Sequence, residues 1–134
     1  HNRTHSFPTR RSSDLVSGNG HGRFWLSDSS VVISHRFAWA LDHGADLALQ
    51  VEVLSHRCDN PLCQRPDHLT PTTNAENRRQ WASRRHQVGG PLRDLRGARG
   101  RAQELRDAAA RNEDLEPVAA AGIPELDKLQ RPLF

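Results

Sequence analysis

Two cysteines and a histidine at equal spacing form the strongest chemical pattern in the sequence. Cys58, Cys63 and His68 follow the pattern C-x4-C-x4-H, and the chain contains no other cysteine. Thiolate and imidazole are the ligands that a structural zinc prefers. Pro61 and Pro66 fix the backbone on either side of Cys63, which favours a short loop folded around one ion. The sequence therefore predicts a Zn²⁺ site at Cys58, Cys63 and His68.

A structural zinc site is closed by four ligands, so the sequence has to supply one more. We expect His35, which is followed by Arg36, to be the fourth ligand. His56 and His43 are the alternatives, and a histidine bound to zinc would not be free to act as a base. His35 also suits a different role, as a partly buried histidine at the start of a helix.

Two regular elements flank the segment that carries Cys58, Cys63 and His68, which we call the zinc loop. Val51–Ser55 is a β-prone run that would place His56 at the end of a strand. After the loop, Thr73 is followed three residues later by Glu76, the capping-box pattern of a helix N-terminus. Asn77 then falls in the first turns of that helix. The sequence thus predicts a strand, a metal-binding loop and a helix, with a histidine on the strand and an amide on the helix.

The segment from His56 to Asn77 resembles the HNH nucleases, also called ββα-metal or His-Me finger nucleases. Its order, H-x-C-x4-C-x4-H-L followed by an asparagine on the helix, looks most like the His-Cys box homing endonucleases. It is also similar to the short HNH proteins of phages and actinobacterial mobile elements, which share the HRCDNPxCxxPxHL motif and an HR pair like that at His35. The strong resemblance covers this segment, and a weaker one extends upstream to about Gly20.

The resemblance implies a role for each residue of the motif. His56 would be the general base, and Asn77 would bind a catalytic Mg²⁺ ion. Cys58, Cys63 and His68 would hold a separate structural Zn²⁺ ion that does not touch the substrate.

Two positions depart from the pattern of the family. Ser55 stands where many HNH enzymes have an acidic metal ligand, and Arg65 stands where an asparagine is common. The His-Cys box branch also lacks the acidic ligand, so we expect Asn77 to be the one protein ligand of the catalytic ion.

The resemblance implies a metal-dependent DNA endonuclease that leaves 5′-phosphate and 3′-hydroxyl ends. A neutral imidazole at His56 can take a proton from water near pH 7, because the reference pKa of histidine is about 6.5. A Mg²⁺ ion can stabilise the charge that builds up on the phosphate. Two alternatives stay open: a catalytically inactive zinc-binding module that binds DNA, and a truncated fragment that does not fold.

The charge of the chain favours nucleic acid as a partner. The formal net charge is +3 with an isoelectric point near 9.6, and Lys128 is the only lysine beside many arginines, whose planar guanidinium groups suit phosphate. We expect double-stranded DNA to be bound by arginines of the zinc loop and the following helix. These candidates are Arg57, Arg65, Arg78, Arg79, Arg84 and Arg85. Alternatively, the helix arginines form only a solvated face. The basic surface that binds DNA would then lie around Arg23 or between Arg93 and Arg106.

A β-hairpin and a short helix are predicted upstream of the motif. The runs RFWL and VVIS flank Ser27–Ser30, a turn-prone segment. Ser34 is expected to cap a helix from His35 to Gly44, with Phe37, Ala38 and Leu41 facing inward, and Trp39 as a further inward candidate. Asp46–Gln50 is read as a connection. Residues 1–15 fit no element and resemble translated sequencing adapter, and residues 16–22 are read as a linker rich in Gly and Ser.

The chain after Gly90 is predicted to be a helical tail. One helix is expected over residues 98–115 and a second over Leu115–Ala121, interrupted by Pro117. Leu129, Leu133 and Phe134 are apolar and expected to be exposed, so the tail would dock on the domain or form a homodimer. No apolar run approaches a membrane span, and we expect a cytoplasmic protein of bacterial or phage origin.

Together these elements predict an α+β fold of three parts. Residues 1–19 are a disordered artefact or linker, residues 20–88 are the HNH nuclease domain, and residues 89–134 are the helical tail. The domain would consist of a small β-hairpin and a helix followed by a zinc-stapled ββα-metal motif.

Overall fold

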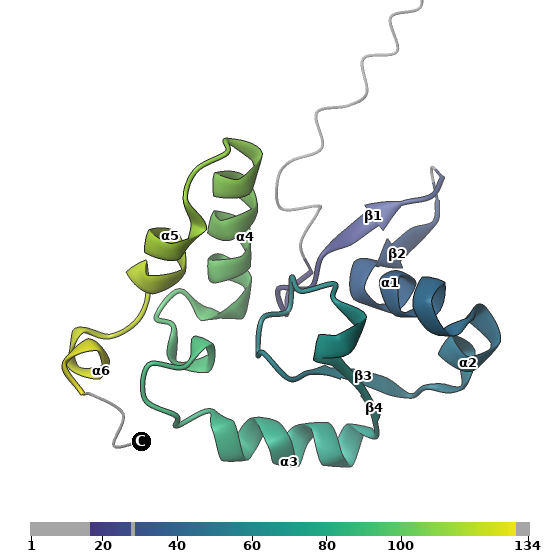
Figure 1. Ribbon diagram of the computed structural model, residues 1–134, viewed down its shortest axis with the longest axis horizontal. Coiled ribbons are helices and arrows are strands. Elements are labelled where there is room, and N and C mark those ends of the chain that lie inside the picture. The colour runs from purple at the N-terminus through teal and green to yellow at the C-terminus, as the bar shows by residue number, and fades with distance from the viewer. Residues whose placement is uncertain (1–16, 28, 131–134) are drawn as a thin grey trace, which may run out of the picture.

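The computed structural model describes residues 17–27 and 29–130 (Figure 1). These residues form the predicted α+β fold, with two antiparallel β-hairpins, six α-helices and two short 3₁₀ helices. The predictions for residues 1–15 and for Leu133 and Phe134 lie outside the described residues. In chain order, the elements are β1 (Arg23–Trp25), β2 (Val31–Ile33), α1 (Ser34–His43), α2 (Ala45–Gln50), β3 (Val53–His56), η2 (Pro66–His68), β4 (Leu69–Thr72), α3 (Asn74–Arg84), η3 (Pro91–Arg93), α4 (Gly97–Ala110), α5 (Leu115–Ala121) and α6 (Glu125–Leu129).

The first hairpin leads directly into α1. β1 and β2 pair antiparallel, with Arg23 opposite Ile33, as the alternating apolar runs predicted. The expectation that Ser34 caps the helix is wrong, because Ser34 is its first helical residue and Ile33 occupies the cap position without a side-chain bond. Gly44 ends the helix, as predicted, and its φ of 96° is a conformation that glycine adopts readily.

The buried stripe of α1 differs from the predicted one. Trp39 is 3% exposed and packs with Leu54 and Leu69 in the central core. Phe37 and Leu41, predicted to face inward, are exposed. A short helix against a small hairpin buries one narrow face, and here that face follows His35 and Trp39, which are four residues apart.

The segment read as a connection is a helix, α2. Arg36 donates hydrogen bonds from its guanidinium group to the carbonyl oxygens of Ala48 (3.0 Å) and Val51 (2.8 Å). These bonds satisfy carbonyl groups at the C-terminal end of α2, which has too few residues to be stable alone. Local patterns do not predict this helix, because its support comes from a side chain on α1.

The second hairpin and α3 form the predicted strand, loop, strand and helix. β3 pairs antiparallel with β4, with His56 opposite Leu69, and the intervening loop carries both cysteines. Thr73 Oγ1 accepts a hydrogen bond from the backbone N–H of Glu76 (3.2 Å), so the predicted cap is confirmed. The Glu76 carboxylate binds Arg79. In a full capping box the Glu76 carboxylate would accept a hydrogen bond from the backbone N–H of Thr73. Here an ion pair with Arg79 takes the place of that second bond.

Helices α4 and α5 pack on one another, and α4 lies beside the zinc loop (Figure 1). α4 ends at Ala110, five residues before the predicted end, and buries Ala102, Leu105 and Ala108. α5 has the predicted bounds. Pro117 does not interrupt it, because this residue lies in the first turn, where no N–H partner is required. Leu129 is exposed, as expected, and no described helix is long and apolar enough to cross a membrane.

Residues 17–22 are packed against the domain, so the prediction of a linker is wrong for this stretch. The backbone N–H of Ser17 donates to the carbonyl oxygen of His21 (2.9 Å), the N–H of His21 donates to the hydroxyl oxygen of Ser17 (3.0 Å), and Gly20 is buried. A Cβ atom on Gly20 would lie 2.7 Å from the carbonyl oxygen of Ala98 and 2.9 Å from Cγ of Pro61. This glycine therefore permits close contact between the N-terminal turn, the zinc loop and α4.

Candidate metal centre and catalytic groove

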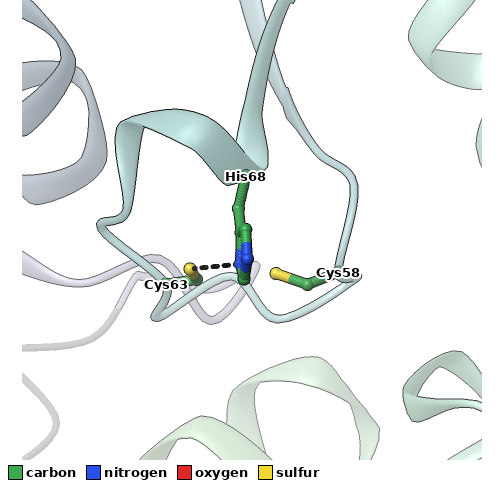
Figure 2. Close-up of side chains that lie close together, drawn as sticks. All are labelled: Cys58, Cys63 and His68. Carbon is green, nitrogen blue, oxygen red and sulfur yellow. Dashed lines mark hydrogen bonds between the residues drawn. The ribbon is translucent and has the colours of Figure 1, made fainter.

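The loop between β3 and β4 brings the predicted zinc ligands together. The ligand atoms of Cys58, Cys63 and His68 all lie within 4.8 Å of one another. Figure 2 shows the His68 ring directed between the two sulfur atoms. His68 closes η2, whose first residue is Pro66, so the 3₁₀ turn carries the imidazole back over the cysteines.

The distances in this group suit a tetrahedral ion. Cys63 Sγ lies 3.5 Å from His68 Nδ1. Two ligands of one tetrahedral zinc, at typical Zn–S and Zn–N bond lengths, would be about 3.6 Å apart. Burial raises the pKa of the Cys58 thiol, so a nearby cation is needed to hold this side chain as a thiolate near neutral pH. The three residues therefore fit a metal ion such as zinc.

The expected fourth ligand, His35, is not part of this group. Its ring lies instead against the rings of His21 and His56, with ring centroids 4.9 Å and 4.6 Å away. Its Nδ1 atom is buried without a hydrogen-bond partner among the described residues. Burial, followed by the neighbouring His56, lowers the pKa of His35 to about 3, so this ring is neutral at physiological pH.

His56 stands at the end of β3, beside the metal group and outside it. Its Nε2 atom lies 3.1 Å from the carbonyl oxygen of Cys63. A carbonyl oxygen only accepts hydrogen bonds, so Nε2 carries the proton and Nδ1 is left as the basic nitrogen. Burial lowers the pKa of His56 to about 4, against a smaller raising effect of the bond to Cys63. The ring is thus a neutral base at neutral pH.

His21 completes a group of three histidines and was not identified from the sequence. Its ring stacks on that of His56, with centroids 5.5 Å apart and an interplanar angle of 30°. Burial lowers the pKa of His21 as well. The only sequence signal was a histidine next to glycines in an apparent linker, which gives no indication of a contact with a residue 35 positions later.

His56 and Asn77 line the same groove, which has a volume of about 530 Å³. Asn77 lies in the first turns of α3, as predicted, and is half-buried. Trp81, one turn further along α3, is 48% exposed and forms part of the groove. The base and the amide therefore face one open space.

Ser55 points away from this groove. It is 3% exposed, and its hydroxyl group donates a hydrogen bond to the carbonyl oxygen of Thr70 (3.4 Å). Successive side chains of a strand face opposite sides, so Ser55 and His56 cannot share a site. One acidic residue does line the groove, Asp59, which lies in the zinc loop.

Asp59 forms an ion pair with Arg84 at 2.8 Å. Arg84 also donates to the carbonyl oxygen of His56 (3.4 Å), so this arginine ties α3 to the zinc loop. Burial is the largest influence on Asp59 and raises its pKa despite the arginine. Arg84, predicted to bind DNA, thus lines the groove but has structural partners.

The other predicted DNA-binding arginines fall into two groups. Arg65 and Arg79 pair with acidic neighbours, Asp67 and Glu76, and Arg85 lies 5.1 Å from the ring of Trp81. None of these three arginines lines the groove. By contrast, the exposed side chains of Arg57 and Arg78 make no hydrogen bond or ion pair with the described part of the chain, and Arg78 lines the groove.

The chain is similar to one curated protein of a phage. Over 63 residues, or 46% of this chain, it is 35% identical to protein 2.8 of Escherichia phage T7. The match covers 40% of the phage protein, so the chain spans less than half the length of this relative. No protein-family model matches the chain, and no solved structure matches it significantly.

Proposed function

We propose that this protein is a metal-dependent DNA endonuclease of the HNH type. One observation carries the proposal. His56 and Asn77 line one groove, and the bond from His56 Nε2 to the carbonyl of Cys63 leaves Nδ1 as the basic nitrogen of a neutral ring. A base next to an amide oxygen that can hold a hard cation is the minimum required for metal-assisted phosphodiester hydrolysis.

The residues of the groove divide the reaction between them. Nδ1 of His56 takes a proton from the attacking water, whose oxygen forms a bond to phosphorus as the bond to the 3′ oxygen breaks. The side-chain oxygen of Asn77 would hold a Mg²⁺ ion, and this ion would supply positive charge to stabilise the phosphate and the departing oxygen. Arg78 adds a positive charge at the same groove and attracts the DNA backbone.

The proposed zinc ion has a separate, structural role. Cys63 contributes a thiolate to the metal group and its own carbonyl oxygen to His56. A zinc ion at this loop would fix the position of that carbonyl group and therefore the orientation of the base. Zinc and catalysis are thereby connected through one residue.

A catalytically inactive zinc-binding module that binds DNA is the second candidate. Its support is the low exposure of His56, 9%, which limits the access of water to the ring. The similarity to a phage protein is compatible with either candidate and supports a bacterial or phage-encoded origin.

A plasmid-nicking assay separates the two candidates. Supercoiled plasmid is incubated with the purified protein and Mg²⁺, and with His56→Gln as the matched variant. We expect the parent protein to convert supercoiled DNA to nicked or linear forms and the variant to leave it intact. DNA binding without any cleavage by the parent protein in the presence of Mg²⁺ or Mn²⁺ would favour the inactive module.

A further inference from the structure

The catalytic groove has two sides that come from distant parts of the chain. One side is formed by the zinc loop and by α3, with Asn77, Arg78 and Trp81. The other side is formed by the segment around the start of α4, with Leu92 and residues 96–99. In Figure 1, the N-terminal end of α4 faces the zinc loop across from α3. The segment after residue 88, taken as a tail from the sequence, therefore borders the site of the proposed chemistry.

This second side is held in place by buried contacts. Asp94, which is 7% exposed, binds Arg96 at 2.7 Å and approaches Arg101 at 3.5 Å. The backbone N–H of Leu95 donates to the carbonyl oxygen of Gly122 (2.8 Å), which ties the start of α4 to the end of α5. Buried ion pairs with several bonds fix geometry even where their net contribution to stability is small.

The second side also contacts the zinc loop through Gly20. The close approach of this glycine to Ala98 and to Pro61 leaves no room for a side chain. Ala98 belongs to the first turn of α4, and Pro61 lies between the two cysteines. The start of α4 and the metal group are therefore packed through one intervening residue, so the distance across the groove is restricted.

Each side of the groove carries one arginine whose side chain has no acidic partner among the described residues. Arg78 on α3 and Arg99 on α4 are exposed, and their side chains make no hydrogen bond or ion pair with residues 17–27 or 29–130. The other arginines of the groove are engaged, Arg84 with Asp59 and Arg96 with Asp94. Asp59 is the one acidic residue among the described residues that line it.

The first turn of α4 adds to the positive electrostatic potential of the groove. The N–H of Gly97 is bonded to the carbonyl oxygen of Asp94 (3.0 Å), but the turn has no acidic residue and no side-chain cap, so the positive end of the helix dipole lies at this side of the groove without a compensating charge. A phosphate group suits such a surface, because its negative charge is attracted by the helix dipole and by the guanidinium groups together.

We propose that residues 89–130 complete the nuclease by forming the second wall of the groove, in which Arg99 and Arg78 bind phosphates of the same DNA strand from opposite sides. This inference rests on the proposed function for the identity of the ligand. A groove of about 530 Å³ has the size that proteins use for one small organic molecule, so it takes one or two nucleotides of one strand and not the width of a duplex. The exposed face of Trp81 offers an apolar contact for the sugar or base beside the bound phosphates.

Binding in the absence of Mg²⁺ tests this inference separately from cleavage. The affinity of the full chain for a fluorescein-labelled DNA duplex is measured by anisotropy as a function of salt, for the parent protein, Arg99→Gln, Arg78→Gln and Arg111→Gln. Arg111 follows α4 at its other end, pairs with Glu113 and is the matched control. Arg99 and Arg78 have no structural partner, so their variants should fold as the parent protein does.

We expect Arg99→Gln and Arg78→Gln each to reduce the log–log salt slope of binding by about one unit, and Arg111→Gln to leave it unchanged. A slope for Arg99→Gln equal to that of the control would overturn the inference, even if the parent protein cleaves DNA. If the parent protein binds with the expected slopes but cleaves nothing with Mg²⁺, the two-walled groove stands and the proposed nuclease activity is wrong.

Discussion

The imidazole of His56 and the backbone carbonyl of Cys63 are joined by a hydrogen bond of 3.1 Å. The candidate base is thus oriented by a residue that also belongs to the candidate zinc group. Because a carbonyl oxygen can only accept, this bond selects the tautomer of His56 and directs its basic Nδ1 away from the metal loop. A change at the zinc loop should therefore act on catalysis through the orientation of one ring.

Replacing His56 tests its role as a base. We expect His56→Gln to reduce the rate of DNA nicking by at least ~10²-fold, the usual contribution of a positioned general base. Glutamine can still donate from its side-chain amide to the Cys63 carbonyl, so zinc content and thermal stability should stay close to those of the parent protein. His86→Ala is the control, since His86 is exposed and lies after α3. Loss of zinc in His56→Gln would identify His56 as a metal ligand instead.

The pH dependence of cleavage should differ from the expectation based on the reference pKa of histidine. A reference pKa of about 6.5 predicts a rate that rises through roughly pH 6 to 7.5. In the structure, burial lowers the pKa of His56 to about 4. A base must be deprotonated to act, so activity is fully present above the folded pKa and is lost as the pH falls through it. We therefore expect the acid limb of kcat/KM well below pH 6, and a limb near 6.5 would show that the ring is more solvated than its burial indicates.

The local motif could be predicted from the sequence because its residues are close in the chain. Cys58, Cys63 and His68 are held by turn residues and a 3₁₀ turn within the same loop, and the cap at Thr73 needs a partner only three residues away. Such short-range patterns depend little on the rest of the fold. The register of β3 and β4, with His56 opposite Leu69, depends in addition on which strand residues are buried.

The long-range neighbours of the site could not be predicted in this way. His21 lies in a stretch whose glycines and serines are typical of a linker, and its stacking on His56 depends on the buried turn at Gly20. Arg99 lies on a helix whose apolar face gives no sign of which part of the domain it contacts. The burial of His35 against other histidines, which argues against its predicted place at the metal, has the same origin in tertiary packing.

Removing one zinc ligand should cost the fold as well as the activity. We expect Cys63→Ser to lose bound zinc and to unfold at lower temperature than the parent protein, because structural zinc supplies on the order of 10 kcal/mol to small domains. Native mass spectrometry gives the metal content and circular dichroism gives the melting temperature. Ser83→Ala, on the exposed face of α3, is the control variant, and it should keep the metal content and melting temperature of the parent protein. Parent protein purified without any bound metal, yet folded, would contradict the zinc site.

The close contact at Gly20 leads to the last prediction, which links the N-terminal turn to the groove. A methyl group there would lie 2.7 Å from the Ala98 carbonyl oxygen and 2.9 Å from Pro61, and the φ of 85° is strained for any L side chain. Gly20→Ala should therefore destabilise the protein by more than about 1 kcal/mol and separate the start of α4 from the zinc loop.

The matched control is Gly18→Ala, because Gly18 lies in the same turn and a Cβ atom there would meet nothing within 4 Å. Urea denaturation gives the free energy of unfolding for the two variants and the parent protein. DNA binding without Mg²⁺ then shows whether the groove has changed. We expect Gly20→Ala alone to lose stability and affinity together, since Ala98 and Arg99 share the first turn of α4. Equal stability of the two variants would mean that the N-terminal turn does not hold α4 against the zinc loop.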